Sequence, residues 1–190
     1  GRERHAGYRG KSGMGTRDGA RRAASGLPYH GNFFCNVPPA PDAAADTAWR
    51  AALAPDDREF GLDASAVPAG PGRVPFSAAA AELLAEFRPP VVSFHFGLPA
   101  PELLAQVKRW GALVLSSATT LPEALWLEEH GADAVIAQGL EAGGHRGHFL
   151  SMDLSEQLDT LALVPQLVAR LRVPVIAAGG VADAAGVRAV

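Results

Sequence analysis

The sequence predicts an α/β protein built around a parallel β-sheet. Strand-like segments begin at Val91, Leu113 and Ala134, so they recur about every 21 residues, the length of one compact strand–helix unit. These strands are short and almost wholly apolar, which is typical of parallel strands covered on both faces. A fourth strand at 173–178 follows after about 40 residues, and extra length after a strand end suggests a loop that covers a ligand.

Residues 31–35 are predicted to form an earlier strand, which ends at the Pro-containing segment 37–39. Residues 40–88 are predicted to form alanine-rich helices interrupted by a turn-forming stretch at 68–75. The total is about five strands. Eight strands would close a barrel, whereas a doubly wound sheet could stop at five, and the pattern alone leaves both architectures open.

Helix signals fill the intervals between the strands. Residues 101–109 are predicted to form the first of these helices. In the next interval Pro122 stands at a favourable first position behind the capping residue Thr120, and Gly131 ends the helix as a C′ glycine. An apolar-periodic helix is predicted over 158–171.

The amino-acid composition limits the classes of function that the chain can have. Apolar residues make up 48% and charged residues 19% of the 190, which is ordinary for a soluble globular domain. The net charge of −3 gives no case for nucleic acid or a membrane surface, and no run approaches the roughly 20 apolar residues of a membrane span. The single Cys35 cannot form an internal disulfide, so we expect a buried structural thiol in a reducing, cytoplasmic protein.

The first 28 residues differ from the rest of the chain. Residues 1–22 carry seven Arg or Lys against Glu3 and Asp18, about +5, which leaves about −8 for the remainder. This Gly- and Arg-rich segment is expected to be a poorly ordered lead-in, and residues 29–190 to form the folded domain. Because the chain begins with Gly1 and stops within a predicted helix, it is expected to be part of a longer protein.

Polar and glycine-rich groups stand at four predicted strand ends: Asn32, the run 116–120, Gln138 with the turn 139–147, and Gly179-Gly180. The carboxyl ends of parallel strands share one edge, so these groups can converge. The amides of Asn32 and Gln138 suit the edge of a heterocycle, although Asn32 could instead hold a loop. Gly179-Gly180, before a helix predicted near Val181, suits a phosphate or is simply a tight turn. Together these groups predict a site for a flat, phosphorylated cofactor.

His145 is the predicted base of this site. Imidazole moves protons near neutral pH, and the glycines at 143, 144 and 147 let the main chain approach a ligand closely. His145 and His148 form an H-x-x-H pattern, but no cysteine or carboxylate cluster supports it, so no metal is expected. His95 is expected to be a hydrogen-bonded interior histidine rather than a substrate contact. Glu141 is expected to orient the loop or to pair with Arg146 rather than to act as an acid.

From about Gly31 to Val190 the chain resembles the nitronate monooxygenase family. The resemblance rests on five segments: Asn32-Phe33-Phe34-Cys35, residues 88–97 with Ser93-Phe94-His95-Phe96-Gly97, residues 116–120, residues 138–147 with Glu141-Ala142-Gly143-Gly144-His145, and residues 177–180. A similar Glu-Ala-Gly-Gly-His turn occurs in flavin-dependent enoyl-acyl carrier protein reductases, so the combination of segments carries the resemblance.

The resemblance implies a TIM barrel, of which strands three to seven are present, with FMN across its C-terminal mouth. It implies that His145 is the catalytic histidine and that Asn32, Gln138, Gly143, Gly179 and Gly180 belong to the FMN site. The implied reaction is oxidation of alkyl nitronates, such as propionate 3-nitronate, by dioxygen. The alternatives are an enoyl reductase and a noncatalytic fragment that cannot hold FMN, because residues 1–28 match neither of the first two strands of the family.

Overall fold

The computed structural model of the chain describes residues 28–63 and 74–190. It divides into two compact units, one formed by the chain up to Asn36 together with Pro75–Val190, and the other by Val37–Val74. The second unit contains helix α2 (Ala43–Glu59), which the Asp42 carboxylate caps. The predicted lead-in at 1–28 lies outside the described residues except for its last position, as does most of the predicted turn at 68–75.

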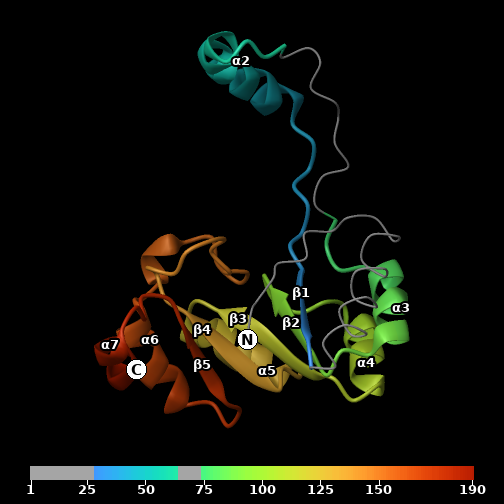
Figure 1. Ribbon diagram of the computed structural model, residues 1–190, viewed down its shortest axis with the longest axis vertical. Coiled ribbons are helices and arrows are strands. Elements are labelled where there is room, and N and C mark those ends of the chain that lie inside the picture. The colour runs from blue at the N-terminus through green and yellow to red at the C-terminus, as the bar shows by residue number, and fades with distance from the viewer. Residues whose placement is uncertain (1–27, 64–73) are drawn as a thin grey trace. The chain divides into compact units, whose positions relative to one another are not determined.

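The first unit contains a five-stranded sheet, shown in Figure 1. Its strands are β1 (His30–Phe34), β2 (Val91–His95), β3 (Leu113–Ala118), β4 (Ala134–Gln138) and β5 (Val175–Ala178). All neighbouring strands are parallel, and they follow one another in chain order from β1 to β5. A doubly wound sheet reverses its strand order at a switch point, whereas the wall of a TIM barrel does not. The described strands therefore have the order of a barrel wall, which confirms the predicted fold class.

The helices of this unit are α3 (Ala78–Phe87), α4 (Pro101–Arg109), α5 (Leu121–Glu129), α6 (Thr160–Val168) and α7 (Ala184–Ala189), with a 3-10 turn η2 (Leu154–Glu156) before α6. The prediction for α4 is confirmed at both ends. Thr120 caps α5 as predicted, accepting a hydrogen bond from Glu123 N, and Gly131 beyond its end has the left-handed φ of 100°. Helix α6 begins later than the predicted residue 158 because Asp159 caps it by accepting from Ala162 N, and it also ends earlier than predicted, at Val168.

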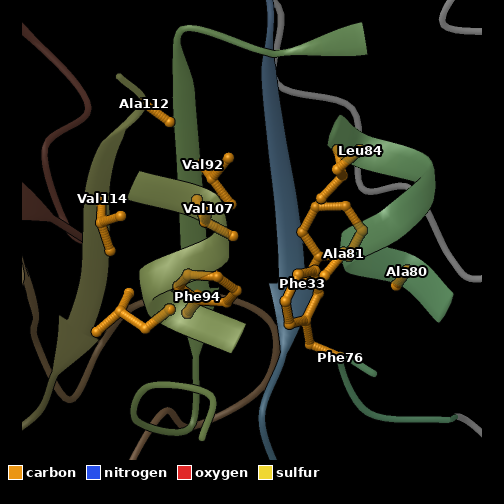
Figure 2. Packing of buried hydrophobic residues seen from close by; sticks show 11 residues of the cluster. Phe33, Phe76, Ala80, Ala81, Leu84, Val92, Phe94, Val107, Ala112 and Val114 are labelled. Atoms are coloured by element: carbon orange, nitrogen blue, oxygen red, sulfur yellow. The ribbon is translucent and has the colours of Figure 1, made fainter. Parts of the chain in front are cut away.

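The helices cover one face of the sheet. Alternate strand residues point into this layer and are fully buried, among them Val92, Phe94, Val114 and Val135. Figure 2 shows the half of the core that lies by β1 and β2, where the rings of Phe76 and Phe94 meet edge to face at 5.1 Å. Removing a buried ring of this kind typically costs about 3–5 kcal/mol, so this layer holds the strand ends in place.

The opposite face of the sheet is not covered by the described helices of this unit. Leu113 and Ile176 on this face are 56% and 43% exposed, so the expectation that both faces are covered is wrong for this part of the chain. The reason is topological, since crossovers of one hand between strands in consecutive order place every connecting helix on the same side. The helix-free face carries the polar residues at the strand ends.

Candidate functional site

Asn32 lies near the end of β1 and pairs in register with Ser93 of β2. Ser93 Oγ donates a hydrogen bond to Asn32 Oδ1 at 2.8 Å, and His30 Nε2 lies 2.7 Å from the same hydroxyl. The Asn32 carbonyl oxygen is thereby fixed, whereas its two N–H donors have no acceptor among the described residues. The sequence did not single out Ser93, because its partnership with Asn32 depends on the register of the two strands.

Gln138 ends β4 and holds the loop that follows it. Its Nε2 donates to the main-chain oxygen of His145 at 2.8 Å, and its Oε1 accepts from Gly147 N at 2.7 Å. The side chain is buried, with 8% exposed. Gln138 therefore fixes the residues on both sides of Arg146, and one N–H and one lone pair of its amide remain beyond these two bonds.

His95 ends β2 and contacts the same loop. Its Nε2 lies 3.0 Å from the main-chain oxygen of His145, and its Nδ1 lies 3.0 Å from Ser117 Oγ on β3. Both ring nitrogens have hydrogen-bond partners, as predicted for an interior histidine. Three neighbouring strands thus meet at one loop, through Gln138, His95 and Ser117.

The His145 side chain is exposed and lies beside aromatic rings. Its ring centre is 5.1 Å from that of Phe34, at an interplanar angle of 67°, and 6.1 Å from that of Phe96. Phe96 has a φ of 66°, a left-handed conformation that costs a non-glycine residue roughly 1–2 kcal/mol. Strain of this kind is common at functional sites, and here it places an aromatic ring beside the candidate base.

The glycines of the turn have different roles. A side chain at Gly143 or Gly144 would meet nothing within 4 Å, so the space beside these two glycines is open, and ligand contact there stays a prediction. A Cβ at Gly147 would lie 2.6 Å from His95 Cε1 and 3.0 Å from Gln138 Oε1. The expectation that Gly147 gives room to a ligand is therefore wrong, because the two side chains that hold the loop fill that space.

Gly179 and Gly180 follow β5 with φ angles of 115° and 67°. A Cβ at Gly179 would lie 2.7 Å from Ala142 Cβ, and one at Gly180 would lie 2.7 Å from Glu141 Oε1. The two glycines therefore pack against the turn at 139–147. The expected helix near Val181 begins only at Ala184, and the Asp183 carboxylate caps it by accepting from Gly186 N. The expectation that a helix N-terminus lies directly behind Gly179-Gly180 is therefore wrong, while a phosphate contact of their main-chain N–H groups stays a prediction.

The Glu141 carboxylate lies between the turn at Gly179-Gly180 and the start of α6, where it has a structural role. Its two oxygens accept from Thr160 N, the first residue of α6, at 3.1 and 3.2 Å. Hydrogen bonds from its own main chain and from Thr160, together with the nearby Arg146 cation, lower its pKa. A carboxyl group that stays ionised is a poor proton donor, which agrees with the expectation that Glu141 orients the loop.

Sequence reasoning missed Glu123. This side chain of α5 is 1% exposed and accepts four hydrogen bonds: from Thr119 N and Oγ1 at 2.8 Å, from Phe149 N at 2.6 Å and from Leu150 N at 3.2 Å. Thr120 and Glu123 form the Thr-x-x-Glu pattern of a capping box, which was the available signal. That pattern predicts a bond to Thr120 N, whereas the carboxylate reaches one residue further and across to the loop.

A metal site finds no support in the part of the chain that is described, where no group of three or more His, Cys, Asp or Glu side chains could hold an ion. His148 is half-buried, and its Nδ1 has no partner among the described residues. No helix within residues 28–63 and 74–190 is long and apolar enough to cross a bilayer.

Known proteins resemble this chain over most of its length. A family model described as nitronate monooxygenase matches residues 20–190. The nitronate monooxygenase of Paraburkholderia phytofirmans is 41% identical over 97% of this chain and 53% of its own length. That of Pseudomonas aeruginosa is 41% identical over 88% of this chain and 48% of its own length. The chain thus spans about half the length of these relatives.

Solved structures show the same fold. The nitroalkane oxidase from Streptomyces ansochromogenes superposes with a TM-score of 0.81 at 36% identity, covering 97% of this chain and 54% of its own. FabK from Thermotoga maritima superposes with a TM-score of 0.64 at 24% identity, covering 97% of this chain and 44% of its own. At that identity the second likeness supports the fold alone.

Proposed function

Since this chain belongs to the nitronate monooxygenase family, we propose that the site around His145 oxidises alkyl nitronates with dioxygen and uses FMN as its cofactor. The observation that carries the proposal is the arrangement of His145 itself. Its main chain is held by Gln138 and His95, while its imidazole is exposed beside Phe34 and Phe96. A base held in this way is preorganised for a small substrate.

The donor set fits FMN. The main-chain N–H groups of Gly143, Gly144, Gly179 and Gly180 have no acceptor among the described residues, and neither have the amide N–H groups of Asn32. Neutral and anionic oxygens along a flavin and its phosphate match such donors. Neighbouring strands lie about 4.8 Å apart, so β1 and β5 are separated by roughly 19 Å along the sheet. An extended ligand could therefore use both edges, with Asn32 towards one end and Gly180 towards the other.

Protein groups would share the chemistry as follows. A neutral His145 imidazole can accept the α-proton of a nitroalkane, and the resulting imidazolium stabilises the nitronate anion. Phe34 and Phe96 keep water from one side of this pair, which strengthens its electrostatic attraction. FMN supplies the electron-accepting chemistry that these side chains lack. Propionate 3-nitronate is one substrate of the proposed class, and the lone Cys35 supports a cytoplasmic setting.

Replacing His145 tests the proposal. We expect His145→Ala to keep its bound flavin, measured by visible absorbance, because the main-chain contacts of the loop do not involve the imidazole. Oxygen consumption with neutral nitroalkanes should fall about 10²- to 10⁴-fold, the usual worth of a general base. Preformed nitronates, which need no deprotonation, should lose much less. His148→Ala, three residues along the same loop, is the matched control.

Two results would contradict the proposal. A purified protein without flavin absorbance, which also fails to bind added FMN, would favour the noncatalytic alternative. A flavin-containing protein that consumes no oxygen with nitronates, but rapidly oxidises NADH in the presence of an enoyl thioester, would instead be a reductase. Unchanged nitroalkane turnover in His145→Ala would remove that residue from the role of base.

A further inference from the structure

We propose that His95 is a positioning residue for His145, acting from β2 through the main-chain oxygen of His145 with one fixed ring tautomer. The proposal deepens the proposed function, on which its catalytic consequence rests. Its structural part concerns only contacts within the chain, so it can be tested separately.

The tautomer follows from hydrogen-bond chemistry. A main-chain oxygen can only accept, so the contact of 3.0 Å between His95 Nε2 and the oxygen of His145 requires a hydrogen on Nε2. In the neutral ring Nδ1 then carries the lone pair, and it accepts from the Ser117 hydroxyl at 3.0 Å. Ser117 is buried, with 6% exposed. The main-chain oxygen of His145 therefore selects the tautomer with the hydrogen on Nε2, and the Ser117 hydroxyl, which can donate, matches the lone pair left on Nδ1.

The His145 oxygen receives donors from two different strands. Gln138 Nε2 reaches it from β4 at 2.8 Å, and His95 Nε2 reaches it from β2 at 3.0 Å. Two donors on one carbonyl fix the orientation of that peptide, and with it the direction in which the His145 side chain leaves the loop. Gly147 packs against both donors, since its missing side chain would overlap the His95 ring. The four residues form one brace, which we define as His95, Ser117, Gln138 and Gly147.

A role for His95 as the base itself fits less well. Its Nε2 hydrogen is held by a carbonyl, and its Nδ1 lone pair is engaged by Ser117. To accept a substrate proton it would have to give up the Ser117 bond. His145, in contrast, presents an exposed ring, so the geometry assigns positioning to His95 and proton transfer to His145.

The structural test uses the chain as it is, without flavin or substrate. Long-range ¹H–¹⁵N NMR should find the His95 hydrogen on Nε2. In His95→Phe, which keeps a ring but loses both hydrogen bonds, exchange of the Gly147 amide hydrogen should accelerate about threefold to tenfold. His95→Gln, whose amide can still reach the His145 oxygen, should restore exchange to within about twofold of the wild type.

The proposal is overturned if the His95 hydrogen is found on Nδ1 and Nε2 carries none. It is also overturned if exchange of the Gly147 amide hydrogen is unchanged in a folded His95→Phe, or if His95→Gln does not restore the wild-type exchange rate. If His95→Phe does not fold, the wild-type tautomer and the exchange in His95→Gln decide the question.

The catalytic test compares kcat with KM. We expect His95→Phe to lower kcat for neutral nitroalkanes about tenfold with KM changed less than about twofold, and His95→Gln to recover most of it. A rise in KM at constant kcat would show that His95 binds substrate, against the proposal. A protein without nitronate activity but with the predicted tautomer and exchange would refute the proposed function and leave the brace intact.

Discussion

Gly143 and Gly147 lie four residues apart in one turn, yet they lack a side chain for different physical reasons. The space beside Gly143 is open, whereas the space beside Gly147 is filled by His95 and Gln138. A sequence shows both as glycines in a glycine-rich turn and so predicts ligand contact for both. Only the positions of the neighbouring strands separate a glycine that leaves room for a ligand from one that packs against the protein itself.

This difference predicts that alanine lowers stability at Gly147, whereas at Gly143 it affects FMN binding instead. Gly147→Ala should lower the free energy of unfolding by about 1–3 kcal/mol, because a methyl group would overlap the His95 ring and strain its two hydrogen bonds. Gly143→Ala should change stability by less than about 0.5 kcal/mol, and under the proposed function it should weaken FMN binding. Urea denaturation and flavin titration measure the two effects. Equal stability losses would show that the packing around Gly147 has no special cost.

Among the individual elements, α5 does more than cover the sheet. Its Glu123 carboxylate binds the residue before its own cap and, across the unit, the main chain of Phe149 and Leu150. The long loop after β4 is thus tied at Gln138, Glu123 and Glu141, each of which accepts main-chain N–H groups. A loop with several such anchors can present an exposed histidine without moving freely.

Glu123→Gln tests this anchor. The amide has one acceptor oxygen in place of two, so bonds to either Thr119 or the loop must be lost, and an N–H group is left facing other donors. We expect unfolding free energy to fall by about 2–3 kcal/mol and exchange of the Phe149 and Leu150 amide hydrogens to accelerate. Glu129→Gln, an exposed position on the same helix, is the matched control. Similar losses in both variants would mean that the effect belongs to charge on α5 rather than to the anchor.

Elements were predictable where their signals are local. The caps at Thr120 and Gly131 and the bounds of α4 depend on neighbouring residues in the chain, and these predictions are confirmed. The start of α7 was predicted three residues too early, because Gly-Gly was interpreted as a helix entrance while Asp183 is the residue that caps it. Ser93 and Glu123 escaped prediction because their partners come from other elements. Ser117 was predicted to lie at the site as part of the run 116–120, but its bond to His95 was not, because a single sequence does not contain the register that joins the two strands.

For the whole molecule, the repeat of strand and helix predicted a parallel sheet, and it left the choice between barrel and doubly wound sheet open. The order of the strands decides that choice, and order is a long-range property that local periodicity does not encode. The same order explains the helix-free face at Leu113 and Ile176. The convergence of Gly179-Gly180 with the turn after Gln138 was predictable, because carboxyl ends of parallel strands share an edge, whereas the contact of His95 at the end of β2 with the same turn was not predicted.

The buried thiol of Cys35 makes the stability of the first unit depend on pH. Cys35 follows β1, its main-chain N–H donates to His95 O at 2.8 Å, and its side chain packs against the core beside β1 and β2. Burial raises the pKa of the thiol from 9.0 to about 12. Between these values the unfolded chain releases a proton that the folded chain keeps, so stability is fully present below about pH 9 and is lost as pH rises above it.

A pH series with Cys35→Ala isolates this effect. Near pH 10.5, about 1.5 units above the ordinary thiol value, linkage predicts that the wild type loses about 1–2 kcal/mol more unfolding free energy than the variant, relative to pH 7.5. Other groups that titrate in this range act on both proteins and cancel in the comparison. Urea denaturation at the two pH values measures the difference, and the same fold should make the native thiol slow to alkylate at pH 8. Parallel pH dependences, or rapid alkylation of the native protein, would place the thiol in solvent and contradict its burial beside the strand that carries Asn32.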